Sequence, residues 1–239
     1  MKWKYRGEKY VCPLCGKRYA RFIPGGFDYP VLKELDVVGA GFRENARCPN
    51  CDANDRQRLI FLFLSQNGFL KKSLDVLHVA PEKQLQKVLK RINQKKYVSI
   101  DLDSTLAEYR MDIQRLNFQD ESFDLIICSH VLEHVVNDRL AMREIRRVLR
   151  PGGTAILQVP ISWKLSAIDE EPTLLDEKER VRRFGQIDHI RMYNEGGYLE
   201  RLNESGFSVR VLPPTEIVDE NLIQLYALNP RESLYICSR

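Results

Sequence analysis

The most regular alternation of apolar and polar positions lies between residues 123 and 160. An apolar run ends at the polar pair Ser129-His130, a stretch with apolar residues every three or four positions follows, and Gly152-Gly153 leads into a second apolar run. Two short apolar runs around a segment of period 3.6 predict a β-α-β unit of a parallel sheet, with the glycines reversing the chain after the helix. The residues expected to be buried are Leu125, Ile126 and Ile127 in the first strand and Leu140, Ile145, Val148 and Leu149 on the helix.

Similar patterns predict further elements on both sides of this unit. The expected strands are residues 74–80, 97–101, 110–113, 207–212 and 234–238, and the expected helices are 82–92, introduced by Pro81, and 195–205. Another helix is expected to begin at Asp55 as its N-cap and to stop at Gly68, joining the N-terminal part to the rest.

Composition narrows the class of protein. The chain has 239 residues, of which 44% are hydrophobic and 29% charged, and no apolar run approaches the roughly 20 residues of a membrane helix. The N-terminus MKWKYRGEKY lacks the apolar segment of a signal peptide. We therefore expect a globular cytoplasmic protein that does not enter a membrane.

The net charge of +4 is unevenly distributed. Residues 1–58 carry a net charge of +5 and residues 59–239 one of −1. A basic front segment permits an acidic partner such as RNA, and it is equally compatible with a solvated basic surface. The oligomeric state leaves no signal in the sequence.

Four of the six cysteines form two CxxC pairs, CPLC at residues 12–15 and CPNC at 48–51. Two such turns present the four sulfurs that a closed, structural zinc site requires, so the predicted metal ligands are Cys12, Cys15, Cys48 and Cys51. A redox or unliganded role is the alternative. The 32-residue spacer between the pairs is expected to form a β-hairpin or a loop excursion, while Cys128 and Cys237 lie in predicted strands and are expected to belong to the core.

Acidic residues follow successive predicted strands. Asp101 ends the strand at 97–101, Asp103 is its close neighbour, and Asp112 lies in the next strand. Carboxyl ends of parallel strands meet at one edge of the sheet, where a carboxylate can accept both ribose hydroxyls of a nucleoside. The alternative for any single carboxylate is loop solvation or helix capping.

DIQRLNFQDESFDLIICSHVLEHV, RVLRPGGTAILQVP and YVSIDLD resemble class I S-adenosylmethionine-dependent methyltransferases over residues 70–239. With CPLCG, CPNC, LHVAPEK and FGQIDHIRMY, the chain is more closely similar to a bacterial group that carries an N-terminal zinc knuckle. The resemblance implies an α/β fold with a seven-stranded, Rossmann-like sheet of six parallel strands and one antiparallel strand near the end. It also implies a zinc-ribbon-like module at 1–58, a linking helix to about 70, and a methyltransferase domain at 71–239.

The resemblance further implies residues that hold S-adenosylmethionine. Asp101 or Asp103 would bind the ribose, Asp112 and Ile113 would frame the adenine, and Ser129-His130 would lie beside the methionine moiety. The full expected set is His78, Val79, Ala80, Pro81, Asp101, Leu102, Asp103, Asp112, Ile113, Ser129 and His130.

One departure from the family pattern bears on cofactor binding. Where the family has an acidic residue and alternating glycines after the first strand, this chain has His78, Ala80, Glu82 and Gln84. Ala80 still permits a close approach and Pro81 still introduces a helix N-terminus, but Glu82 adds a carboxylate that could meet the cofactor's cationic groups or favour the helix dipole. A chain that keeps the fold without the cofactor is therefore an alternative.

Two histidines are candidate catalytic bases, His130 and His189, and for each the alternative is a hydrogen-bonding or ligand-contact role. Either Glu133 or His134 is expected to cap the following helix. Arg56 and Arg58 are expected to contact a phosphate or a carboxylate, or else to form surface or interdomain ion pairs.

The inserted segment 161–190 is expected to cover the site or to make an oligomer contact. The favoured reading is a methyltransferase acting on a small molecule or saccharide that enters between this segment and the zinc module. The alternatives are an RNA methyltransferase and a non-catalytic binding module.

Overall fold

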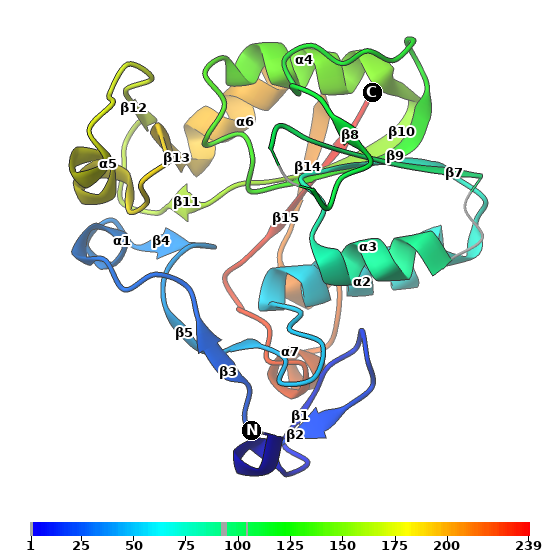
Figure 1. Cartoon of the computed structure of the whole chain (residues 1–239), viewed down its shortest axis with the longest axis vertical. Coiled ribbons are helices and arrows are strands. Elements are labelled where there is room, and N and C mark those ends of the chain that lie inside the picture. The colour runs from blue at the N-terminus through cyan, green and yellow to red at the C-terminus, as the bar shows by residue number, and fades with distance from the viewer. Residues whose placement is uncertain (1, 92–94, 104) are drawn as a thin grey trace.

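The computed structural model describes residues 2–91, 95–103 and 105–239, and seven strands of these residues form the central sheet (Figure 1). Their order is β14-β15-β10-β9-β6-β7-β8. The strands are β6 (Asp75–Val79), β7 (Lys96–Asp101), β8 (Tyr109–Arg110), β9 (Phe123–Ser129), β10 (Leu149–Gln158), β14 (Ser208–Leu212) and β15 (Leu234–Ser238). β15 runs antiparallel to both of its neighbours and the other six strands share one direction. The predicted fold class is confirmed.

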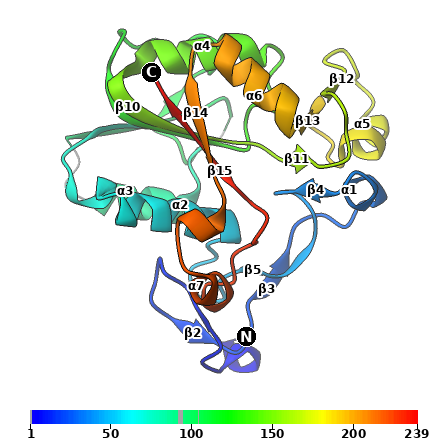
Figure 2. The same cartoon turned by 180° about the vertical axis from the view of Figure 1, so that it is seen from behind.

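Helices cover both faces of this sheet (Figures 1 and 2). α4 (Asp138–Val148) and α6 (Glu195–Glu204) lie on one face, and α2 (Asp55–Gln66) and α3 (Lys83–Arg91) lie on the other. The shorter helices are η1 (Lys2–Tyr5), α1 (Pro30–Glu34), η2 (Phe69–Lys71), α5 (Glu177–Phe184), η3 (Pro214–Glu216) and α7 (Glu220–Leu225). None of the helices among these residues combines the length and the apolar character that crossing a membrane requires.

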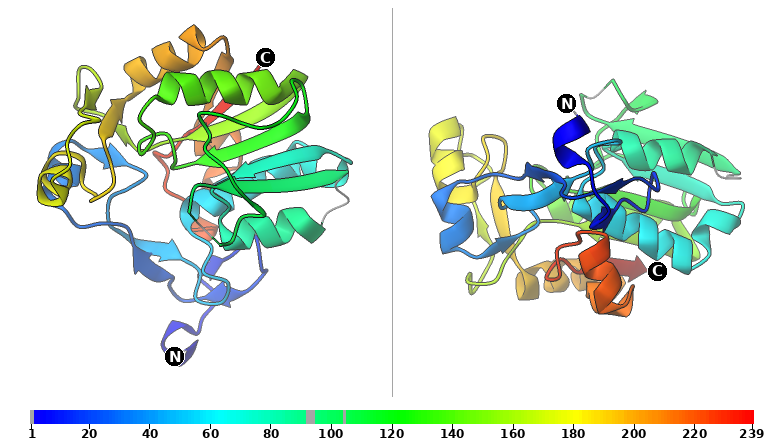
Figure 3. Two further views of the ribbon diagram at one scale, coloured as in Figure 1. Left: turned by 45° about the horizontal axis from the view of Figure 1, so that its top comes forward. Right: turned by 90° about the horizontal axis from the view of Figure 1, so that it is seen from below.

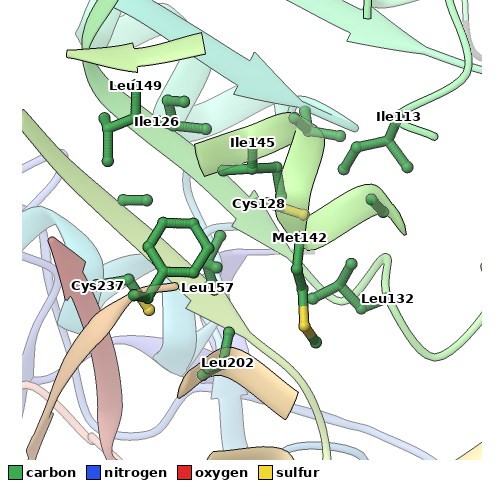
Figure 4. Packing of buried hydrophobic residues seen from close by; sticks show 14 of the residues in the cluster. Ile113, Ile126, Cys128, Leu132, Met142, Ile145, Leu149, Leu157, Leu202 and Cys237 are labelled. Atoms are coloured by element: carbon green, nitrogen blue, oxygen red, sulfur yellow. The ribbon is translucent and has the colours of Figure 1, made fainter. Parts of the chain in front are cut away.

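The core between the sheet and α4 and α6 is drawn in Figure 4. Ile126 and Cys128 of β9 pack with Leu157 of β10, Met142 of α4 and Leu202 of α6, and all five are fully buried. Burying a large apolar side chain contributes about 1.5–3 kcal/mol each, so this layer holds the β-α-β unit in place. Leu125 and Ile127 face the opposite layer with α2, as a strand buried on both faces requires.

The predicted face of α4 was partly wrong. Leu140 is 37% exposed and Leu149 is the first residue of β10, whereas Ile145 and Val148 are buried with Ala141 and Met142. Ala141, Met142, Ile145 and Val148 recur every three or four positions and pack against the sheet, and Leu140 lies at the edge of that face.

The Pro-Gly-Gly segment lies inside β10 instead of preceding it. The register with β9 shifts between Leu149 and Thr154, and Gly152 has φ +75°. The segment is thus an irregularity within a strand that already begins where α4 ends.

α2 is capped one residue earlier than predicted. Asn54, not Asp55, is the N-cap, because its side chain accepts from Gln57 N while the Gln57 side chain accepts from Asn54 N. Asp55 is instead buried and paired with Arg43. Gly68 follows the C-cap in a left-handed conformation, which confirms it as the stop.

Two further boundaries differ. β8 covers only Tyr109–Arg110, so Asp112 lies in the loop beyond it. α3 begins at Lys83, and Ile92 of the predicted helix lies outside the described residues.

The spacer between the CxxC pairs combines both predicted alternatives. β3 (Ile23–Gly25) and β5 (Arg43–Arg47) pair antiparallel, and the excursion between them carries α1 and β4 (Val37–Val38). β4 pairs with β11 (Ile161–Ser162) in a second sheet that continues through β13 (Arg191–Asn194) to β12 (Asp169–Glu170). The spacer and the 161–190 segment therefore lie side by side (Figure 3). The first CxxC pair lies in the turn between β1 (Tyr10–Val11) and β2 (Arg18–Tyr19), which pair antiparallel.

Arg58 joins the N-terminal part to the C-terminal segment. It is fully buried, and its guanidinium makes no ion pair with an acidic residue in the described part of the chain. Its guanidinium donates five hydrogen bonds to backbone carbonyls, of Asn45, Ala46 and Ala53 on one side and of Tyr226 and Ala227 on the other. We expected Arg58 to bind a phosphate or carboxylate, or else to form a surface or interdomain ion pair. Instead, it holds two parts of the chain together through backbone carbonyls.

We expect Arg58→Met to lower the free energy of unfolding by about 3 kcal/mol or more, because it leaves five buried or partly buried carbonyls without their donor. Chemical denaturation measures this. The control is Arg210→Met, since Arg210 is exposed and paired only with Glu216, and it should change stability by less than about 0.5 kcal/mol. Equal stability of the two variants would contradict the clamp.

Candidate active site

The carboxyl ends of four neighbouring strands meet at one edge of the sheet. Val79 at the end of β6 pairs with Ile100 of β7 and Cys128 of β9, and Asp101 pairs with Arg110 of β8. The residues that follow these positions therefore face one region, which is where open α/β sheets bind ligands.

The turn after β6 adopts its close conformation without glycine. Ala80 has φ +47° and its N–H donates to the Ile100 carbonyl at 2.8 Å. Pro81 is buried and α3 begins two residues later. A small side chain at Ala80 thus does part of what a glycine would do, at some conformational cost.

Glu82 is held by a histidine beneath it. His78 is fully buried, with Nδ1 3.0 Å from Tyr97 Oη and Nε2 3.0 Å from Glu82 Oε2. Burial opposes ionisation of Glu82, but the His78 hydrogen bond and the charge of Arg56 outweigh it and hold the pKa of Glu82 below its ordinary value. Any part for the His78 side chain in ligand binding is indirect, through Glu82.

The strand-end carboxylates have different surroundings. Asp101 is half-buried, and its Oδ1 accepts from Asp103 N at 2.9 Å. The Asp103 side chain is 79% exposed and pairs with Arg110. Asp112 accepts from Gln114 N at 2.8 Å in the loop after β8, while Leu102 is exposed and Ile113 is buried.

The polar junction at the end of β9 contacts the spacer. Ser129 is buried, and its Oγ has no hydrogen-bond partner among the described residues. His130 has φ +55°, and its ring lies against Gly39, where an added Cβ would be 3.2 Å from Cε1. Gly39 itself has φ +98°, so the turn needs glycine both for its backbone and for the approach to His130.

A cavity of about 310 Å³ opens at this junction. It is lined by spacer residues between 25 and 47, by Asn54 and Arg56 at the start of α2, by the loop after β9, and by residues 186–189. Both candidate catalytic bases, His130 and His189, therefore line one cavity. Arg56 lines it as well, with Nη1 3.3 Å from the Gly39 carbonyl and a buried Nε that lacks a partner among the described residues.

Glu133 and His134 also face this cavity, although neither caps α4. Asn137 is the cap, so the predicted capping role is wrong and both residues lie in the preceding loop. Glu133 and His189 are each 1% exposed, and His189 Nε2 is 4.0 Å from Glu133 Oε1. The spacing H-x-x-E-H with a distant histidine was the signal in the sequence that could have marked this cluster.

Burial shifts the titration of these groups. It raises the pKa of Glu133, lowers the pKa of His130 well below its ordinary value, and lowers that of His189 to about 3. Both carboxylate oxygens of Glu133, Nε2 of His130 and both ring nitrogens of His189 are buried without a hydrogen-bond partner in the described part of the chain. Each such orphaned group costs about 1–3 kcal/mol.

Arg191 fixes the loop that carries Glu133 and His134. It is 1% exposed and donates to the carbonyls of Leu132, Val135 and Val136. Its Nε lies 3.1 Å from Glu170.

Glu170 in turn binds Arg201, with Oε1 2.6 Å from Nη2. The Arg201 Nη1 and the Tyr193 hydroxyl both lie 2.6 Å from Asp138 Oδ2. This network ties the 161–190 segment to α4 and α6.

The four cysteines of the CxxC pairs are gathered in one place. Their sulfurs all lie within 4.8 Å of one another, with 3.6 Å between Cys12 and Cys51 and 3.8 Å between Cys15 and Cys48. Cys128 and Cys237 are fully buried in the sheet, as expected of core residues.

Comparison with known proteins adds to this geometry. Residues 64–157 match the sequence model of a family described as "Methyltransferase domain". The match covers less than half of the chain. The matched residues include the turn at Ala80, Asp101, Asp112 and the Ser129-His130 junction.

The curated relatives match only in part. "Uncharacterized protein YafE" of Escherichia coli is 28% identical over 40% of this chain and 44% of its own length. "Uncharacterized 37.1 kDa protein in transposon TN4556" of Streptomyces fradiae is 41% identical over 43% of this chain and 29% of its own length. The aligned part therefore spans less than half of either relative.

Solved structures share the fold. "Crystal Structure of the [4+2]-Cyclase SpnF" matches with a TM-score of 0.53 and 14% identity, over 76% of this chain and 79% of that one. A SAM dependent methyltransferase from Archaeoglobus fulgidus matches with a TM-score of 0.50 and 13% identity, over 77% and 94%.

The network around Glu170 predicts a pH dependence. Its hydrogen bonds with Arg201 lower the pKa of Glu170 from 4.5 to about 2, so the folded state favours the carboxylate. The resulting stabilisation is present above pH 4.5 and is lost as the pH falls toward 2. Glu170→Gln should therefore melt below the parent protein at neutral pH, and the gap should narrow as the pH falls through that window.

Thermal melts between pH 7 and pH 3 test this, with Glu179→Gln as the control. Glu179 pairs with Arg182 on the exposed surface of α5, so its variant should follow the parent protein at every pH. A gap for Glu170→Gln that does not change with pH would contradict the ionic origin of the effect.

Proposed function

We propose that the chain is an S-adenosylmethionine-dependent methyltransferase that binds its donor at the carboxyl edge of β6, β7, β8 and β9. The observation that carries the proposal is that the methyltransferase domain match covers all four strand ends, where Asp101 and Ser129 end β7 and β9 and Asp112 lies in the loop after β8. S-adenosylmethionine supplies a methyl group bound to a positively charged sulfur.

The residues at this edge fit such a donor. Asp101 offers carboxylate oxygen to the ribose hydroxyls, and Asp112 offers the same to an adenine amine. The Ser129 hydroxyl and Oε1 of Glu82 are buried polar atoms that lack partners among the described residues, so both are ready to bind the polar end of a ligand. The carboxylate of Glu82, which His78 helps to keep ionised, suits the cationic groups of the donor.

We place the acceptor in the 310 Å³ cavity beside His130. This volume lies at the lower end of the range of about 300–1,000 Å³ for small-molecule sites, which favours a small molecule or a single sugar unit. The unpartnered Nε of Arg56 offers a cationic donor to an anionic group of the acceptor. Nε2 of His130, also unpartnered, is the atom placed to accept the proton that an acceptor loses.

The fold alone leaves other reactions open. The cyclase SpnF shares it, so a chain with this sheet need not transfer a methyl group. Together with the glycine-free turn at Ala80, this keeps a non-catalytic module as the second candidate. An RNA acceptor, suggested by the basic segment 1–58, would give binding that weakens steeply with salt.

We further propose that the four cysteines hold one structural zinc ion. Four sulfurs within 4.8 Å match tetrahedral thiolate coordination, which leaves no position open for catalysis. The ion would stabilise a segment whose own core, around Phe22 and Tyr19, is small.

Donor binding is expected to depend on Asp101. Calorimetry should show S-adenosylhomocysteine binding to the parent protein, and Asp101→Ala should weaken it by about 10–100-fold, since a carboxylate bonded to two hydroxyls contributes about 1.5–3 kcal/mol. The matched control is Asp103→Ala, because the exposed Asp103 pairs with Arg110 and should contribute little. Absence of binding to the parent protein at millimolar ligand would reject the enzyme in favour of the module.

Zinc content is expected to depend on the cysteine cluster. Metal analysis of the purified protein should show one more zinc equivalent than in Cys48→Ser, and that variant should be less stable. Cys237→Ser, in the core and far along the chain, should keep the same zinc content as the parent. A folded parent protein with no metal at the cysteines would refute the zinc assignment.

A further inference from the structure

We propose that Glu133, His134 and His189 form a second metal site, for a divalent first-row transition cation, open toward the cavity beside His130. The three residues come from the loop after β9 and from the segment that precedes β13. They are separate from the cysteine cluster.

The distances suit a single ion. One ligand atom from each residue lies within 4.8 Å of the others, and Nε2 of His189 is 4.0 Å from Oε1 of Glu133. Imidazole and carboxylate ligands bind such cations at about 2.0–2.2 Å, so atoms on opposite sides of an ion are separated by up to about twice that distance. Little movement would bring the three groups onto one cation.

The burial of these groups is an independent observation that indicates a ligand. Glu133 and His189 are each 1% exposed, yet both carboxylate oxygens and both ring nitrogens lack hydrogen-bond partners in the described part of the chain. A cluster built only for packing would pair its members with one another or with backbone groups. A bound cation would occupy a carboxylate oxygen of Glu133 and one ring nitrogen of His189, since the two nitrogens of one imidazole point in different directions and cannot both bind the same ion.

The surrounding contacts resemble the support that metal ligands receive. Nδ1 of His134 lies 3.2 Å from the Asp188 carbonyl oxygen and 3.4 Å from its carboxylate, which orients the ring and leaves Nε2 for a metal. Arg191 fixes the carbonyls on both sides of Glu133 and His134. His130 lies 3.4 Å from Glu133 through Nδ1.

The ligand types select the class of metal. Two imidazoles and one carboxylate favour zinc, iron, cobalt, nickel or manganese over magnesium or calcium, which prefer oxygen ligands alone. Three protein ligands leave coordination positions open toward the cavity. We infer that an oxygen of the acceptor fills one of them, a step that rests on the function proposed above.

The acceptor class that follows is a small molecule bearing a hydroxyl group. Binding to a divalent cation lowers the pKa of a hydroxyl, which makes its oxygen a better nucleophile. The oxygen–carbon bond to the methyl group would form as the carbon–sulfur bond of the donor breaks, and the hydroxyl proton would pass to Nε2 of His130.

Manganese is the probe that separates this site from the cysteines, because thiolates select softer metals. In the zinc-containing 239-residue chain without donor, electron paramagnetic resonance should show one bound Mn²⁺ per chain. Glu133→Gln and His189→Ala should each weaken it at least tenfold, while Glu177→Gln, on exposed α5 of the same segment, should bind as the parent does. Circular dichroism checks that each variant is folded, and the near-isosteric Glu133→Gln keeps the test valid if His189→Ala unfolds.

The proposal is overturned if the parent protein binds no Mn²⁺ at millimolar concentration, or if Glu133→Gln binds it as tightly as the parent. Displacement of Mn²⁺ by an equal concentration of Mg²⁺ would also overturn it, because that order belongs to an all-oxygen site.

The open coordination positions are tested with acetohydroxamate, a chelating oxygen ligand. It should change the spectrum of bound Mn²⁺ in the parent protein, and an unchanged spectrum would contradict an open site. Because neither measurement uses the methyl donor, failure of the proposed methyltransferase function would appear separately, in the calorimetry with S-adenosylhomocysteine.

Discussion

The site depends on one buried guanidinium. Arg191 donates to three carbonyls of the loop after β9 while its other edge pairs with Glu170, so it joins that loop to the second sheet. A charge buried in this way is stable only when its donors are used, and these three carbonyls and Glu170 use them. Fixing this loop sets where Glu133 and His134 lie. Arg191 begins β13, and His189, two residues before it, lies 4.0 Å from Glu133, which in turn lies 3.4 Å from His130.

The N-terminal segment forms part of the wall of the cavity beside His130. Arg58 holds it to the C-terminal segment through backbone carbonyls on both sides, and β4 adds a strand to the sheet that contains β13. The result is that Gly39 lies on the ring of His130 and closes one wall of the cavity. A structural zinc in the cysteine cluster would thus support the acceptor site from a distance, through the rigidity of the spacer.

The features that depend on short stretches of sequence were predicted correctly. Alternating apolar runs predicted β9, α4 and β10 and the rest of the central sheet, and the CxxC spacing predicted a cluster of four sulfurs. Predictions went wrong by one residue at the N-cap Asn54, because the reciprocal hydrogen bonds with Gln57 fix the start of α2 there. The exposure of Leu140 depends on how α4 packs against the sheet, which the period alone does not determine. Two features could not be predicted in this way: the cluster of Glu133, His134 and His189, and the pairing of β4 with β11. Both arise from tertiary contacts between segments far apart in the chain, and the spacing of apolar residues within one segment contains no information about such contacts.

A crystal structure with S-adenosylhomocysteine tests most directly whether the donor and acceptor sites meet at the Ser129-His130 junction. We expect the ribose at Asp101, the adenine beside Asp112 and the sulfur next to Ser129, facing the cavity lined by His130. A ligand bound elsewhere on the chain, or a sulfur directed away from that cavity, would contradict it.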